Sequence, residues 1–285
     1  MIFLSLAIDG LSFGLILFLI SAGLTITLGV MRFVNLAHCA FAMMGGYIGL
    51  AVVRSFDAGL ATASVIAIVV TTGFGWVLER TLYRWAYTTN QLGQILMTIG
   101  LSFTFIAAAN ATFGPMSQTI PIPSILAGSW HFGTLSISAY RMFLVVVSMS
   151  MATAMWFVLD WTDFGARLRA SVDNPRMARC IGVDVDRVMA VAFAAGCGLA
   201  ATGGVLGTQI LALEPYYALK YLVPVLIVVS VGGLGSLKGS FLAALCIGLL
   251  DTYGRYFVPT IGGFVIYLIA SVILLLRPQG LFVRT

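Results

Sequence analysis

The chain has 285 residues, of which 60% are hydrophobic and only 9% carry a charge, and its mean hydropathy is +1.05. A soluble domain has about 25% charged residues, so composition excludes a fully water-exposed surface and indicates a protein embedded in a lipid bilayer. The net charge of +5 reflects an excess of Lys and Arg. We attribute this excess to cytoplasmic loops and not to nucleic-acid binding.

Apolar segments recur along the whole chain. At about 20 residues per crossing, the length accommodates eight or nine crossings and no separate soluble domain. The eight apolar runs cover residues 3–30, 39–53, 60–78, 91–110, 138–159, 189–213, 222–250 and 261–276. The second run is short and the seventh is interrupted by glycines and Lys238, so we expect one or both to be broken or re-entrant. The predicted fold is all-α: a polytopic helical membrane protein with about eight transmembrane segments, plus or minus one, in one domain over residues 1–285.

A polar break at residues 32–38 separates the first two runs. It contains Asn35 and His38, which would share one face if this segment were helical. Amide and imidazole groups at membrane depth are candidates for a solute pathway, and an ordinary interfacial loop is the alternative. A metal site is not expected, because the other histidine, His131, lies in a distant loop and no nearby carboxylate completes a ligand set.

Clusters of arginine predict the orientation. After the third apolar run come Arg80 and Arg84, and at the end of the chain come Arg277 and Arg284. The loop after the fifth run carries Arg167, Arg169, Arg176, Arg179 and Arg187. These three regions are therefore expected to face the cytoplasm. Residues 113–138 are then expected on the opposite side. Their prolines and the Gly114-Pro115 pair predict an irregular loop.

The cytoplasmic loop at residues 160–188 is the most polar part of the chain. Asn174 suits a helix N-cap, Pro175 the first helical position, and Gly182 the left-handed residue that ends a helix. These residues predict a helix of about two turns from Pro175 to Ile181.

One face of this short helix is apolar and carries Met177, Ala178 and Ile181, whereas Arg176 and Arg179 share the other face. Because an isolated helix of this length is unstable in water, something must cover the apolar face. The cover is either the protein's own spans, the lipid interface, or a cytoplasmic partner.

Small residues and membrane-edge carboxylates form two further patterns. Every fourth residue is small in the run Ala192, Gly196, Ala200, Gly204 and Thr208, which indicates close helix packing as the first interpretation and a moving helix interface as the second.

Glu214, Asp251 and Asp9 lie at or near the ends of apolar runs. They either reach the headgroup layer or line a polar cavity, and Glu214 joins Asn35 and His38 as a candidate for the solute pathway.

Several catalytic motifs do not occur in the sequence. It contains no G-x-x-x-x-G-K-[ST] loop for ATP phosphates and no H-E-x-x-H zinc motif. We therefore expect that this chain performs no covalent chemistry, is not an enzyme, and has no cofactor or metal of its own.

The sequence resembles the permease subunits of branched-chain amino acid ABC importers, the LivH type, over nearly its whole length. The segments that carry the resemblance are Gly23-Leu24-Thr25 to Gly29, Asn35-Leu36-Ala37-His38, Glu79-Arg80, Thr98-Ile99-Gly100-Leu101-Ser102, Ala178 to Gly182, Asp186-Arg187-Val188, Gly203-Gly204-Val205-Leu206, Gly232-Gly233-Leu234-Gly235-Ser236 and Arg277-Pro278-Gln279-Gly280-Leu281-Phe282. The resemblance implies a bacterial inner-membrane subunit that pairs with a LivM-like permease, two cytoplasmic ATPases and an extracytoplasmic solute-binding protein. It also implies that the loop around Ala178 to Gly182 holds the coupling helix.

The sequence departs from the family's pattern at two places, so the resemblance does not fix the identity of the transported solute. Cys39 and Ala40 follow the Asn-x-Ala-His element where the family often has glycine and a polar residue, and Asp251 stands where a glutamate is common. Branched-chain amino acids are the first expectation, with amides, urea or aromatic acids as alternatives. A stand-alone channel or secondary carrier is a rival, and an intramembrane enzyme would require a nucleophile or metal beside His38.

Overall fold

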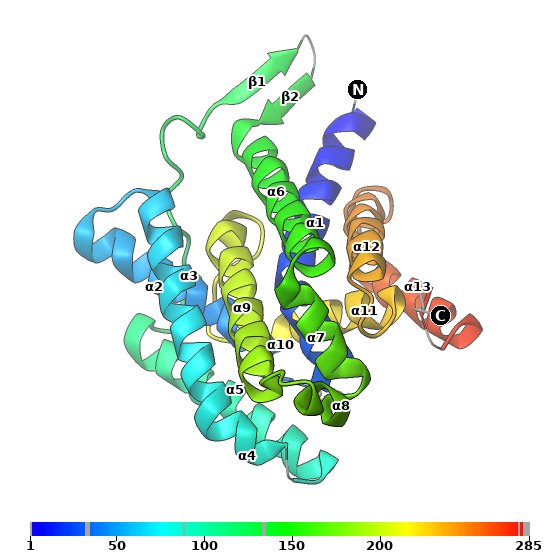
Figure 1. Cartoon of the computed structure of the whole chain (residues 1–285). Helices are drawn as coiled ribbons and strands as arrows, with labels where there is room; N and C mark the ends of the chain where they lie inside the picture. Colours follow the sequence, from blue (N-terminus) through cyan, green and yellow to red (C-terminus); the bar gives the residue numbers. More distant parts are fainter. Residues whose placement is uncertain (1, 32–34, 88, 133–134, 279, 282–285) are drawn as a thin grey trace.

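The computed structural model describes all residues except 1, 32–34, 88, 133–134, 279 and 282–285 (Figure 1). Arg32, Arg284, Gln279 and Phe282, which the sequence analysis used, lie outside the described residues. The elements in chain order are α1 (Ile2–Met31), α2 (His38–Phe56), α3 (Leu60–Leu78), the π-helix η1 (Glu79–Tyr83), α4 (Arg84–Ala86), α5 (Gln91–Phe113), β1 (Ser129–Phe132), β2 (Leu135–Ser138), α6 (Ala139–Trp161), α7 (Asp163–Asp173), α8 (Pro175–Cys180), α9 (Val185–Leu206), the 3-10 helix η2 (Gly207–Gln209), α10 (Tyr217–Lys220), α11 (Leu222–Gly232), α12 (Leu237–Phe257) and α13 (Gly262–Leu276).

The predicted all-α membrane architecture is confirmed. Among the described residues, six helices are long and apolar enough to cross a membrane: Phe3–Gly29, His38–Phe56, Leu60–Ala86, Gln91–Phe113, Ala139–Trp161 and Val185–Gln209. Two shorter apolar helices accompany them, at Tyr217–Gly232 and Gly262–Leu276. The expected seventh run is two helices, α11 and α12. Gly233 and Gly235, with φ of 97° and 82°, form the turn that separates them.

The core of the bundle is built on α1 and α9. α1 packs against α9 and α12, and α9 also packs against α2 and α3. Small side chains on α9 allow this close approach. A Cβ atom added to Gly196 would lie 2.8 Å from the Cα of Gly23 on α1, so the two backbones touch at this crossing.

Two helices begin inside the bundle and not at its surface. His38, the first residue of α2, donates from Nε2 to the carbonyl oxygen of Ile20, at 2.9 Å, near the middle of α1. Tyr217, the first residue of α10, is fully buried. Of the two runs expected to be broken or re-entrant, the seventh is divided into α11 and α12, whereas the second is one continuous helix, α2, that starts beside the middle of α1.

The bundle has two distinct ends (Figure 1). The β1–β2 hairpin and the N-terminus lie at one end, and α4, α7 and α8 lie at the other. Lys238 in the first turn of α12 pairs with Asp160 at the end of α6, at 3.6 Å. The backbone N–H of Leu281 donates to the carbonyl of Val231 at 2.8 Å. The turn before α12 and the last described residues therefore lie close to the α6–α7 corner.

Four local predictions were wrong or incomplete. Residues 113–138 include an antiparallel hairpin, in which Ser129 pairs with Ser138, where only irregular structure was expected. The loop at residues 160–188 contains a second helix, α7, that was not predicted. Arg80 and Arg84 lie in η1 and α4, so the helix that starts at Leu60 continues through the arginines expected in a loop. The short helix α8 ends at Cys180, one residue before the predicted end.

Candidate functional site

The short helix α8 is formed by local signals at both of its ends. Asn174 Oδ1 accepts a hydrogen bond from the backbone N–H of Met177 at 3.0 Å, and Pro175 occupies the first helical position. At the other end, Gly182 has a φ of 86°, a conformation that glycine adopts without strain. Its N–H donates to the carbonyl of Arg179 at 3.1 Å, so the chain turns sharply away from the helix.

The apolar face of α8 is only partly covered by the rest of the chain. Ala178 is buried at 2% exposure and packs inward, whereas Met177 is 60% exposed and Ile181 is 70% exposed. Of the covers considered above, the protein's own spans therefore account for Ala178 alone. Two large apolar side chains remain at the surface, next to the charged groups of Arg176 and Arg179.

One ion pair joins α8 to the start of α9. Arg179 of α8 lies 2.9 Å from Asp186 of α9, and a second pair, Arg187 with Asp184 at 2.8 Å, lies within the first turn of α9 itself. Because these side chains are exposed, each pair contributes at most about 1 kcal/mol, so the Arg179–Asp186 pair sets the orientation of α8 more than its stability. Beside them lies a cavity of about 970 Å³, lined by parts of α7, α8, α9, η1 and α5.

A second polar feature is the buried turn that begins α2. Asn35 is fully buried, and its Oδ1 accepts from the backbone N–H of Ala37 at 3.0 Å and from Tyr83 Oη at 2.9 Å. Tyr83 belongs to η1, so this turn joins the start of α2 to the π-helix. His38 is tied to α1 through Ile20, as described above.

This turn leaves one donor group and one acceptor without partners. Asn35 Nδ2 and His38 Nδ1 are buried and have no hydrogen-bond partner among the described residues. A carbonyl oxygen only accepts, so His38 Nε2 carries the hydrogen and Nδ1 is an acceptor in the neutral ring. Unpaired buried groups of both kinds are costly, which makes the turn a candidate site for water or a polar solute.

The remaining carboxylates singled out by sequence have cationic partners. Glu214 pairs with Lys220 at 2.6 Å, Asp251 pairs with Arg255 at 2.8 Å, and Asp9 pairs with Arg141. Within the described residues, no hydrogen bond or ion pair joins Glu214 to Asn35 or His38. The structure thus brings Asn35 and His38 into one turn and leaves Glu214 in a separate ion pair.

The small residues on α9 lie at helix contacts. Gly196 meets Gly23 on α1, Gly204 meets the backbone of Ala42 on α2, and Ala200 is fully buried. No group of three or more His, Cys, Asp or Glu residues that could hold a metal ion occurs in the described part of the chain.

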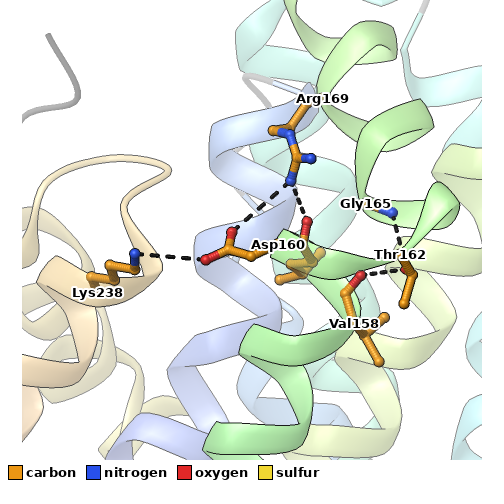
Figure 2. Close-up of polar contacts among 7 residues, drawn as sticks. Val158, Asp160, Thr162, Gly165, Arg169 and Lys238 are labelled. Atoms are coloured by element: carbon orange, nitrogen blue, oxygen red, sulfur yellow. Dashed lines mark hydrogen bonds and ion pairs between the residues drawn. The ribbon is translucent and has the colours of Figure 1, made fainter.

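Sequence reasoning missed two groups that the fold assembles from distant segments. Tyr83 lies between Arg80 and Arg84, in a segment that was predicted to be a loop, and carries no local signal for its bond to Asn35. Asp160, Arg169 and Lys238 come from α6, α7 and α12 and gather beside a second cavity (Figure 2). The sequence analysis noted Lys238 only as an interruption of the seventh apolar run and gave it no partner.

Comparison with known proteins was informative over almost the whole chain. Residues 6–275 match the family described as branched-chain amino acid transport system, permease component. The chain is similar to the high-affinity branched-chain amino acid transport system permease protein LivH of Escherichia coli, with 26% identity over 297 residues, covering 99% of this chain and 96% of the relative.

Two further relatives come from other lineages. The permease protein BraD of a high-affinity branched-chain amino acid system in Pseudomonas aeruginosa is 27% identical over 298 residues, covering 99% of this chain and 96% of BraD. A probable branched-chain amino acid permease protein LivH of Methanocaldococcus jannaschii is 22% identical over 278 residues, covering 93% and 88%.

Proposed function

Because this chain belongs to the family of permease components of branched-chain amino acid transport systems, we propose that it is the membrane-spanning subunit of an ATP-binding cassette importer. It is a transport subunit that crosses the inner membrane several times. Its solute is a small amino-acid-like molecule, with branched-chain amino acids as the first candidate because LivH and BraD carry that substrate in their names. An amide, urea or an aromatic acid is the alternative.

The observation that carries the proposal is the uncovered apolar face of α8. Met177 and Ile181 are exposed at one end of the bundle, beside Arg176 and Arg179. A short amphipathic helix of this kind fits a groove on another protein. We assign α8, with its cap Asn174 and its terminating Gly182, as the coupling helix that contacts a cytoplasmic ATPase.

This assignment fixes an orientation and a set of partners. Residues 160–188 and the C-terminus face the cytoplasm, and the end with the β1–β2 hairpin faces the binding protein. The partners are two ATPases, which bind the ATP that this chain does not, an extracytoplasmic solute-binding protein, and a LivM-like second permease. Hydrolysis next to α8 shifts the bundle between outward-open and inward-open states.

The buried turn at the start of α2 is the proposed solute pathway within this subunit. Asn35 and His38 offer an unpaired donor and an unpaired acceptor beside α1, and Glu214 is a further candidate closer to the hairpin end. Substitution of Asn35 by Leu removes both polar groups at similar volume, and we expect it to lower uptake while the ATPases remain bound.

The coupling role is tested by reconstituting the complete importer in proteoliposomes with its binding protein. Arg179→Glu reverses a charge on α8, and Gly182→Val forces a branched side chain into a left-handed conformation. We expect both variants to lose solute uptake that depends on ATP hydrolysis. The matched control is Arg54→Glu, which reverses an exposed charge near the opposite end of the bundle and removes one hydrogen bond to Gln118. This variant should keep ATP-driven uptake.

Two results would contradict the proposal. Normal ATP-driven uptake by Arg179→Glu and Gly182→Val would remove the coupling role from α8. Solute flux through the purified chain alone, without ATPases, would favour the stand-alone channel or carrier.

A further inference from the structure

The second cavity of the protein has a volume of about 590 Å³ and lies at the same end as α8. This volume is within the range of about 300–1,000 Å³ that is typical of small-molecule sites. Its walls are mostly apolar, with Ile26 from α1, Trp156 and Leu159 from α6, and Leu168 from α7. The cavity therefore suits an aliphatic group.

Three charged side chains from different elements border this cavity. Figure 2 shows the carboxylate of Asp160 between Lys238 of α12 and Arg169 of α7. The separations are 3.6 Å to Lys238 Nζ and 4.0 Å to Arg169 Nη1, which exceed hydrogen-bond distances. Arg169 instead donates to the carbonyl oxygen of Leu159. Asp160 and Lys238 thus attract each other but leave their hydrogen-bonding capacity unused within the described residues.

The charge arrangement selects among ligand classes. A simple anion would be attracted by Lys238 and Arg169 but repelled by Asp160, and a simple cation would be attracted by Asp160 alone and repelled by both basic groups. A zwitterion satisfies both, because its ammonium group can bind Asp160 while its carboxylate binds Lys238 and Arg169. The larger cavity beside α8 differs, since Arg179 and Arg187 there already pair with aspartates at hydrogen-bond distance.

We propose that the cavity bordered by Asp160, Arg169 and Lys238 binds an α-amino acid zwitterion with an aliphatic side chain. The inference rests on the proposed function for the identity of the solute and for the cytoplasmic position of this end. The cavity is then a site where imported solute binds on the product side, and the bound solute bridges the α6–α7 corner to the turn before α12.

Equilibrium binding of radiolabelled L-leucine tests the inference, using the complete importer in nanodiscs without its binding protein. Leucinamide lacks the carboxylate and 4-methylpentanoate lacks the ammonium group, so neither should displace leucine at concentrations where unlabelled leucine does. Asp160→Asn and Lys238→Gln each remove one charged partner, and we expect affinity to fall about tenfold or more. Lys238 is 76% exposed, so its replacement leaves the fold intact.

The matched control is Asp163→Asn, which removes an exposed carboxylate from the first turn of α7 outside the cavity. It should bind leucine as the unmodified importer does. Equal displacement by all three compounds, absence of leucine binding, or unchanged affinity in Asp160→Asn would overturn the inference. ATP-driven uptake is measured separately on the same importer in proteoliposomes with its binding protein: its absence refutes the proposed function, whereas normal uptake with leucine binding independent of Asp160 refutes only this site.

Discussion

Truncation of Ile181 to alanine gives a quantitative test of the contact between α8 and an ATPase. The change removes three side-chain carbons, each worth about 0.8 kcal/mol when fully buried. Ile181 is 70% exposed in the isolated subunit, so about 1.7 kcal/mol remains to be gained when a partner covers it. This free energy corresponds to a roughly 15- to 20-fold weaker affinity for the ATPase subunits, while the stability of the subunit itself changes little.

The assay is titration of the purified ATPases onto the membrane subunits in nanodiscs, with and without the Ile181→Ala change. Ile125→Ala is the control, because Ile125 is 90% exposed in the loop between α5 and β1, at the opposite end of the bundle. It loses the same three carbons and should leave the affinity unchanged. If Ile181→Ala bound the ATPases as tightly as Ile125→Ala, the apolar face of α8 would not be the docking surface.

Three further predictions concern the cap, the core packing and the orientation. Asn174→Ala removes the side-chain cap of α8 and should cost about 1 kcal/mol, seen as roughly fivefold faster hydrogen exchange at the α8 amides by mass spectrometry; unchanged exchange would show that the cap is dispensable. Gly196→Val drives a side chain into the backbone of Gly23 and should destabilise the bundle by about 1–3 kcal/mol, with a lower melting temperature in detergent, whereas Gly100→Val, where a Cβ meets no atom within 4 Å, should be tolerated. Cys180 is a free, exposed cysteine at the end of α8, so a membrane-impermeant maleimide should label it in inside-out vesicles and not in intact cells; labelling from the outside would reverse the proposed orientation.

The parts of the structure that sequence predicted well depend on short-range signals. Asn174, Pro175 and Gly182 mark the ends of α8 because caps and left-handed residues act within one helical turn. The all-α membrane architecture followed from the apolar runs, because a span needs internal hydrogen bonds and a fixed length in lipid. The break in the seventh run was also visible, since its glycines and Lys238 interrupt the hydrophobic pattern.

The parts that sequence did not predict depend on contacts between distant segments. Asn35 was a candidate because of its depth, but its bond to Tyr83 joins α2 to a π-helix, and no local pattern marks either the π-helix or the bond. The partners of Asp160 come from two other helices, so only the folded arrangement brings them together. Helix α7 was missed because its apolar positions are few, although Thr162 precedes it and caps it through a bond from Gly165 N–H.

Helix α7 connects the two surfaces to which this subunit's activity is assigned. Its Leu168 and Arg169 line the smaller cavity, its Ser171 and Asp173 line the larger cavity beside α8, and only Asn174 separates it from α8. An ATPase that displaces α8 therefore acts on the wall of the cavity proposed to bind the solute. If the two sites are linked in this way, leucine affinity must differ with and without the ATPases, and leucine must change ATPase affinity by the same factor. Equal affinities in both conditions would mean that α7 is a rigid wall that transmits nothing.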